Sequence, residues 1–226
     1  MLRAIIFDFD GVITDSETLH FRAFNEALAQ FGAEITTEDY YKDYLGLNDL
    51  ECFGLVNIKY RLKLDDSQIR NLAKQKSRIF KELAKKEGRI IGGVPEFLQM
   101  LRQNNISTAI CSGALLSEIK LILEYGGLQS FFHVIVSADQ VKKGKPHPEG
   151  LLLALEKLNK KEQHPISASQ CIVIEDSRWG LEAARAAGMH TIAVTNSYDA
   201  KQLAMAEKIV TNLKELTVDD LLKLCE

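Results

Sequence analysis

Five short runs of apolar and β-branched residues recur along the chain, each followed by a segment with helical periodicity. They are Ala4–Phe7, Ser107–Cys111, His133–Val136, Cys171–Ile174 and His190–Val194. Uninterrupted apolar runs of this length are typical of strands buried on both faces. Strands that alternate with helices need βαβ crossover connections, which build a parallel sheet. The sequence therefore predicts an α/β fold with a parallel sheet.

The stretch from about residue 17 to about residue 86 breaks this alternation, because it holds helical patterns and no convincing strand. One expected helical face collects Phe21, Phe24, Leu28 and Phe31, and Gly32 follows as a plausible stop. A later face, with Lys and Arg expected opposite, collects Ile69, Leu72, Ile79, Phe80 and Leu83.

These patterns predict a Rossmann-like three-layer core of residues 1–15 and 87–226, with an inserted all-helical cap of residues 16–86. The second join contains Gly88, Gly92 and Gly93. Glycines at this point fit a hinge and an ordinary loop equally well.

Charge and cysteine usage exclude several classes of protein. The formal net charge is −3, which argues against a nucleic-acid binder and removes the attraction to anionic membranes. None of the four cysteines belongs to a C-x-x-C pair, so we expect neither a zinc site nor a disulfide framework. A reducing cytoplasm is the expected compartment.

Two carboxylates, Asp8 and Asp10, directly follow the first strand, and Gly11 comes next. Ligands of open parallel sheets bind outside the carboxyl ends of the strands. Paired carboxylates there need a compensating cation or proton, while a glycine turn exposes backbone amides to an anion. The alternative is a turn with solvated acids.

A second acidic pair, Glu175 and Asp176, ends the fourth run and precedes Ser177. If this pair faces Asp8 and Asp10, several carboxylates converge, and Mg²⁺ would resolve their repulsion. The alternative is that Asp176 or Ser177 only caps the following helix.

Two further motifs supply groups that suit a phosphoryl group. Lys145 lies in the sequence Gly144-Lys145-Pro146, and its ammonium is useful for charge stabilisation in a partly closed site. Ser112 and Gly113 follow the second run and offer a hydroxyl and an amide.

Together the four motifs resemble the haloacid dehalogenase-like superfamily of phosphotransferases. The segment from Asp8 to Ser16, followed by His20, is most similar to its β-phosphoglucomutase-like branch, which includes many sugar-phosphate phosphatases. The resemblance implies Asp8 as nucleophile, Asp10 as acid and base, and Ser112 and Lys145 as phosphoryl-binding groups. It also implies a Mg²⁺ site formed by Asp8, Asp10, Glu175 and Asp176, and a phosphoryl contact from the amide of Gly113. We further expect substrate contacts from Gly11, His20 and Asn48.

The cap loop decides between a phosphatase and a mutase. In the mutases that this chain resembles, a lysine and an arginine flank a glycine, whereas here Leu45 and Asp49 stand at those positions. An aspartate would repel a distal phosphate, so the sequence favours hydrolysis of a small phosphorylated metabolite. Lys42, Lys59 and Arg61 are alternative sources of the missing cations, so a phosphosugar mutase stays open.

Three alternatives remain at this stage. His20 is either a group that couples the cap to Asp10 or an ordinary surface histidine, and Asn48 either contacts substrate or packs its loop. A catalytically silent phosphate-binding protein would lack the nucleophile, which is present here. The expected protein is a monomer or weak dimer that binds neither nucleic acid nor membrane.

Overall fold

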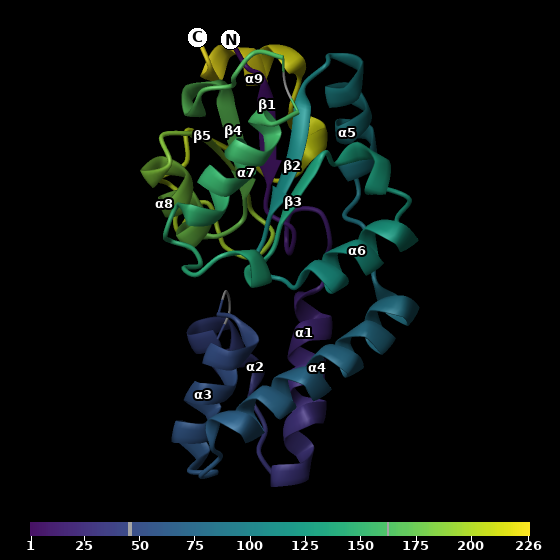
Figure 1. Ribbon diagram of the computed structural model, residues 1–226, viewed down its shortest axis with the longest axis vertical. Helices are drawn as coiled ribbons and strands as arrows, with labels where there is room; N and C mark the ends of the chain where they lie inside the picture. Colours follow the sequence, from purple (N-terminus) through teal and green to yellow (C-terminus); the bar gives the residue numbers. More distant parts are fainter. Residues whose placement is uncertain (45–46, 162) are drawn as a thin grey trace. The chain divides into compact units, whose positions relative to one another are not determined.

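The computed structural model describes residues 1–44, 47–161 and 163–226. The chain divides into two compact units (Figure 1), the first formed by Met1–Asp15 with Ile90–Glu226 and the second by Ser16–Arg89. The boundary expected after residue 86 falls shortly before the observed one. Helix α4 (Asp66–Glu87) runs through the expected position, which keeps these residues with the second unit.

The first unit contains a parallel sheet, as the apolar runs predict. Its strands have the order β3-β2-β1-β4-β5-β6, and every neighbouring pair is parallel. They are β1 (Ala4–Phe7), β2 (Ser107–Cys111), β3 (Val134–Val136), β4 (Cys171–Glu175), β5 (His190–Val194) and β6 (Lys208–Val210). The sequence did not predict β6, because this short strand begins with a lysine and is buried only at Val210, so it lacks the continuous apolar run of the other strands.

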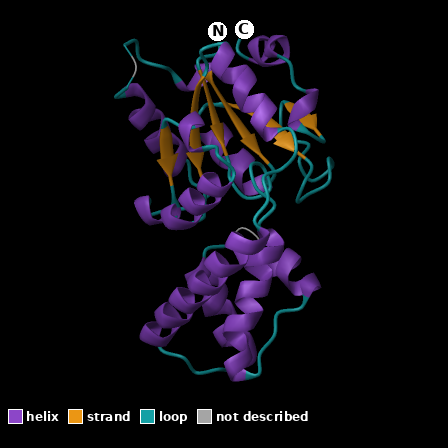
Figure 2. Ribbon diagram, turned by 90° about the vertical axis from the view of Figure 1, so that its right-hand side faces the viewer, coloured by secondary structure: helices purple, strands orange, loops and turns teal. Residues whose placement is uncertain are grey.

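Helices cover both faces of this sheet, as Figure 2 shows. They are α5 (Val94–Gln103), α6 (Leu116–Tyr125), α7 (Glu149–Asn159), α8 (Arg178–Ala186) and α9 (Val218–Leu224). Ala4 and Ile6 of β1 share one core cluster with residues of α7 and α8. On the other face, Phe7 packs against Phe97 of α5, with ring centroids 6.0 Å apart. Burial on both faces explains why the strands are continuously apolar.

The register of the sheet places β1 between the two strands whose ends carry the other motifs. Phe7 is paired with Ile110 of β2 and with Ile174 of β4. Because the strands are parallel, the polar residues after each of them emerge at the same edge of the sheet. This edge is where ligands bind in open α/β sheets.

The described residues of the second unit form helices joined by loops, with no strand among them. It contains α1 (Glu17–Leu28), α2 (Thr37–Asp39), α3 (Asp49–Tyr60) and α4, packed around a core that includes Phe24 and Phe53. The two rings lie 5.0 Å apart between centroids. The predicted apolar face is wrong at Phe31, whose side chain is 39% exposed. Helix α1 ends at Leu28 and a tighter turn follows, so Phe31 leaves the face.

Lys76 contradicts the prediction that the cations of α4 lie opposite its apolar face. It is 1% exposed and lies one turn from both Leu72 and Phe80, which are also buried. Its ammonium donates to Asp49 Oδ1 at 2.7 Å and lies 2.7 Å from His20 Nδ1. A buried cation is costly unless it is paired and hydrogen-bonded, and these contacts meet that requirement.

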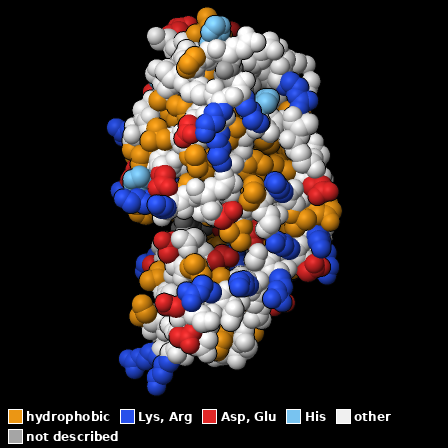
Figure 3. Space-filling model, viewed as in Figure 1, with side chains coloured by type: hydrophobic (Ala, Val, Ile, Leu, Met, Phe, Trp, Pro, Cys, Tyr) orange, Lys and Arg blue, Asp and Glu red, His pale blue; other side chains and the backbone are white. Residues whose placement is uncertain are grey.

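On the face that Figure 3 shows, the acidic and basic side chains are intermingled. Within the described ranges, no helix combines the length and the apolarity that crossing a bilayer requires.

All four cysteines are buried and free.

We predict that Asp49→Asn destabilises the protein by about 1–3 kcal/mol, because it leaves the buried Lys76 ammonium without its counter-charge. The measurement is the free energy of unfolding in urea. Glu82→Gln is the matched control, since Glu82 pairs with Lys85 on the exposed surface of α4 at 3.0 Å. The control should change the free energy by less than about 0.5 kcal/mol. Equal effects of the two changes would contradict the role given to Asp49.

Candidate active site

The pairing of β1 with β4 sets two buried carboxylates beside each other. Asp8 follows β1, and its backbone amide donates to the carbonyl of Ile174 at 2.9 Å. Glu175 is the last residue of β4 and is completely buried. The backbone ladder, rather than the side chains, therefore fixes the spacing of this acidic pair.

Lys145 joins the two carboxylates. Its ammonium donates to Asp8 Oδ1 at 2.5 Å and also to Glu175 Oε1. The lysine comes from the loop before α7, far from both acids in sequence. Charge-assisted hydrogen bonds of this kind are stronger than neutral ones, especially where water is largely excluded. The structure thus brings together three of the residues that the motifs predicted.

The same surroundings change the protonation of these groups. Burial raises the pKa of Asp8 to about 8, helped by the carboxylates of Glu175 and Asp10 and opposed by Lys145. Burial opposes the charge on Lys145, but Asp8 and Glu175 outweigh it and raise the pKa of the ammonium well above its usual range. The lysine stays cationic, and the acids need more positive charge than it supplies.

Glu175 is held from several sides at once. Its Oε2 accepts hydrogen bonds from the amides of Asp176 and Ser177, both at 3.1 Å, and from the Ser177 hydroxyl at 2.8 Å. Ser177 also caps α8 by accepting from the amide of Gly180. A Cβ atom at Gly180 would lie 1.8 Å from Glu175 Oε1, so only glycine fits there. Helix capping and the acidic pair therefore occur together.

Asp176 completes a candidate metal centre. Ligand atoms of Asp8, Glu175 and Asp176 all lie within 4.8 Å of one another. Three buried carboxylates facing one lysine are under-compensated, and oxygen donors of this kind are what Mg²⁺ prefers. The residues present therefore fit a hard divalent cation.

Gly11 shapes the turn after β1. Its φ is +77°, and a Cβ atom there would lie 1.7 Å from Asp176 Oδ2. The amide of Gly11 donates to the carbonyl of Thr14 at 2.8 Å. The Gly11 amide therefore closes the turn, and the substrate contact expected from Gly11 stays a prediction.

Asp10 and the second strand contribute at the same edge. Asp10 is half-buried, and its charge acts on Asp8. Ser112 follows β2, is 6% exposed, and accepts a hydrogen bond from the amide of Ala114 at 2.9 Å. A Cβ atom on Gly113 would have no neighbour within 4 Å, so there is open space beside this backbone segment. Their contacts with a substrate stay predictions.

The predicted cap residues lie in the second unit and are engaged there. The ring of His20 stacks on Phe80 with centroids 4.0 Å apart. Asn48 caps α3, because its side chain accepts from the amide of Glu51 at 3.0 Å. Leu45 and Gly46 of the cap loop lie outside the described residues. Asp49 accepts a hydrogen bond from Lys76, and its expected repulsion of a distal phosphate stays a prediction.

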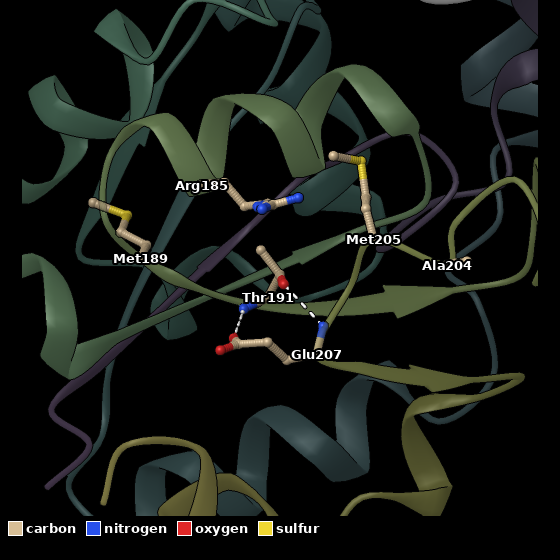
Figure 4. A pocket seen from close by; sticks show the side chains of 6 residues that line it. All are labelled: Arg185, Met189, Thr191, Ala204, Met205 and Glu207. Carbon is tan, nitrogen blue, oxygen red and sulfur yellow. Dashed lines mark hydrogen bonds between the residues drawn. The ribbon is translucent and has the colours of Figure 1, made fainter.

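A cavity of about 510 Å³ lies elsewhere on the first unit, lined by Arg185, Met189, Thr191, Ala204, Met205 and Glu207. Figure 4 shows that Thr191 and Glu207 satisfy each other, since the Thr191 amide donates to the Glu207 carboxylate at 2.7 Å. Thr191 is the second residue of β5, whereas the motifs follow the other ends of their strands. The cavity is therefore separate from the acidic cluster.

Sequence reasoning missed two polar residues at the edge of the sheet. Ser197 donates a hydrogen bond to Asp176 Oδ2, and Asn196 donates to the carbonyl of Gly11 at 2.6 Å. Both follow β5, so the rule that located the other motifs, polar residues just after an apolar run, applies to them too.

Clustered acids and a lysine at the carboxyl edge of a parallel sheet suit the binding of a metal ion together with an anionic group. The chain belongs to the haloacid dehalogenase-like hydrolase family, which it matches over residues 5–194. This confirms the resemblance that the four motifs indicated.

Individual relatives agree with this assignment. The chain is 34% identical to a phosphorylated carbohydrates phosphatase of Thermotoga maritima, over 95% of this chain and 100% of that protein. It is 27% identical to a fructose-1-phosphate phosphatase of Escherichia coli, over 84% and 95%. A β-phosphoglucomutase structure from Clostridium difficile superposes with a TM-score of 0.87 at 25% identity, over 100% and 97%. The last comparison also confirms the predicted fold class.

We predict that Gly11→Ala destabilises the protein more than Gly127→Ala does. Both glycines have positive φ, but a Cβ at Gly127 meets nothing within 4 Å, whereas at Gly11 it collides with Asp176. The control should cost about 1 kcal/mol from backbone strain alone, and Gly11→Ala about 1–3 kcal/mol more. Urea unfolding measures both. Indistinguishable values would show that the turn and Asp176 are not in contact.

Proposed function

We propose that the protein is a Mg²⁺-dependent phosphatase that hydrolyses a small phosphomonoester, such as a sugar phosphate, through an aspartyl-phosphate on Asp8. The observation that carries the proposal is the Lys145 ammonium bound to both Asp8 and Glu175, at the carboxyl edge of the sheet. The names of the relatives in Thermotoga maritima and Escherichia coli support the substrate class.

In the first half of the reaction, a carboxylate oxygen of Asp8 attacks phosphorus while the bond from phosphorus to the substrate oxygen breaks. Asp10 donates its proton to that leaving oxygen, so the alcohol departs neutral. Lys145, the Ser112 hydroxyl and the Gly113 amide hold the phosphoryl oxygens and stabilise their charge. Asp8 suits the role of nucleophile because the β1–β4 ladder and Lys145 fix its position.

In the second half, Asp10 accepts a proton from water as the water oxygen attacks phosphorus. The bond between phosphorus and Asp8 breaks, and the free carboxylate and inorganic phosphate result. Asp10 regains the proton that it had donated, so the cycle is balanced. Such chemistry depends on positioning and charge neutralisation more than on elaborate covalent machinery.

Asp8, Glu175 and Asp176, with Asp10, would hold the magnesium ion. When bound, it would neutralise the carboxylates and the phosphoryl group. Glu175 is the least direct of these ligands, because its two oxygens already accept from Lys145, Asp176 and Ser177. We assign it to orienting Lys145 as well as to supporting the metal.

The cap favours hydrolysis over a mutase reaction. A mutase must bind a substrate that carries a second phosphate, which calls for a cation in the cap. Lys76 is deeply buried and is paired with Asp49 inside the second unit. Asp49 therefore neutralises the charge of Lys76, and it stands where a mutase would have a cation. A catalytically silent protein is disfavoured because Asp8, Asp10, Lys145 and Asp176 are all present.

The proposed partner is therefore a small phosphorylated metabolite rather than a macromolecule. The intermingled surface charges in Figure 3 offer no basic surface on that face for nucleic acid. Four free thiols suit a reducing compartment, and we place the protein in the cytoplasm.

The test is phosphate release from a panel of hexose, pentose and triose monophosphates, with Mg²⁺ and with a chelator. We expect turnover on some members of the panel with Mg²⁺ and none with the chelator. No release from any monophosphate would support the silent alternative.

A second assay distinguishes a phosphatase from a phosphosugar mutase. The protein is incubated with β-glucose 1-phosphate and the glucose bisphosphate activator. We expect free phosphate or no reaction. Formation of glucose 6-phosphate without free phosphate would overturn the phosphatase proposal.

We predict that Asp8→Asn lowers kcat by at least about 10³-fold, because an amide cannot attack phosphorus as a carboxylate does. Phosphate release on the best substrate of the panel measures the loss. Asp219→Asn is the matched control, since it removes an exposed carboxylate from the first turn of α9, and it should leave kcat unchanged. Appreciable turnover by Asp8→Asn would refute the covalent mechanism.

A further inference from the structure

The loop after β5 contacts the candidate metal centre through side chains that no motif includes. Thr195 anchors this loop, because its amide donates to the carbonyl of Val210 in β6 at 3.1 Å. The next two residues, Asn196 and Ser197, reach back toward the ends of β1 and β4. β5 lies next to β4 in the sheet, so this approach follows from the strand order.

Ser197 acts on Asp176 directly. Its hydroxyl donates to Asp176 Oδ2, and Asp176 is only 4% exposed. A hydrogen bond to one carboxylate oxygen restricts rotation about the Cβ–Cγ bond, which fixes the direction of both oxygens. Partners of this kind tune metal sites, because they orient the groups that contact the ion.

Asn196 acts on the turn that follows β1. Its side-chain amide donates to the carbonyl of Gly11 at 2.6 Å. A Cβ built on Gly11 would lie 1.7 Å from Asp176 Oδ2 and 2.9 Å from Ser197 Oγ. The Gly11 backbone, the Asp176 carboxylate and the Ser197 hydroxyl therefore meet at one point, and Asn196 ties the turn to it.

We propose that Ser197 and Asn196 are positioning residues for the divalent cation, with Ser197 orienting Asp176 and Asn196 fixing the turn against it. The inference rests on the proposed function, because it concerns the Mg²⁺ site of that reaction. It adds the loop after β5 to the four strand-end motifs. Neither residue needs to touch the substrate or the ion.

The test is Mg²⁺ binding by calorimetry, in the absence of substrate, to the full chain and its variants. Ser197→Ala should raise the dissociation constant by about 10- to 100-fold, as loss of such partners does in other metal sites. Ser197→Thr keeps a hydroxyl and should recover most of the affinity. Saturating Mg²⁺ should restore most of kcat in Ser197→Ala, because the reacting groups are intact.

The control is Ser169→Ala, which removes an exposed hydroxyl that lies 3.0 Å from the Ser167 hydroxyl, before the start of β4 and at the opposite end of that strand from Glu175. It should bind Mg²⁺ like the wild type. Asn196→Ala is the second variant; Asn196 is exposed, so the protein is expected to fold without its side chain, and its Mg²⁺ affinity should fall in the same direction.

The outcomes separate the inference from the proposed function. Wild-type affinity in both Ser197→Ala and Asn196→Ala would overturn the inference and leave the phosphatase proposal standing. A wild type that binds no Mg²⁺ and releases no phosphate would overturn both. Weaker binding in the two variants, with the Ser169→Ala control unchanged, would support the positioning role.

Discussion

The site depends on one cation held between two buried carboxylates. Lys145 satisfies Asp8 and Glu175 at once, and these acids are adjacent only because β1 and β4 pair in register. A slip of one residue would turn the acids to opposite faces of the sheet. The apolar strands are therefore part of the chemistry, because their packing fixes where charge is placed.

The second unit repeats the same physical solution for another purpose. Lys76 is buried more deeply than Lys145 and is likewise satisfied by a carboxylate, that of Asp49. In the first unit the cation leaves the acidic cluster short of positive charge, which suits a metal and a phosphate. In the second unit the Lys76 ammonium is paired with the Asp49 carboxylate of another helix, so the two charges balance each other within that unit.

The sequence was enough to locate β1 to β5 and most of the polar residues at the carboxyl edge, because polar groups after apolar runs are a strong signal. The burial of Lys76 was not predicted, because helical periodicity places lysines toward solvent and its partner Asp49 belongs to a different helix. The contact of Ser197 with Asp176 was not predicted, because a neutral hydroxyl after a strand is common in ordinary loops. The hydrogen bond from the Gly11 amide to Thr14 was not predicted, because it depends on turn geometry that the sequence does not specify.

The contact between Glu175 and the first turn of α8 has a consequence for transplanting this site. Because a methyl group at Gly180 would clash with Glu175, the end of β4 and the first turn of α8 depend on each other. If the acidic pair alone were grafted onto another parallel sheet, any side chain at the position of Gly180 would clash with the Glu175 carboxylate. A successful graft would carry the strand, the serine cap and the glycine together, as a single cassette.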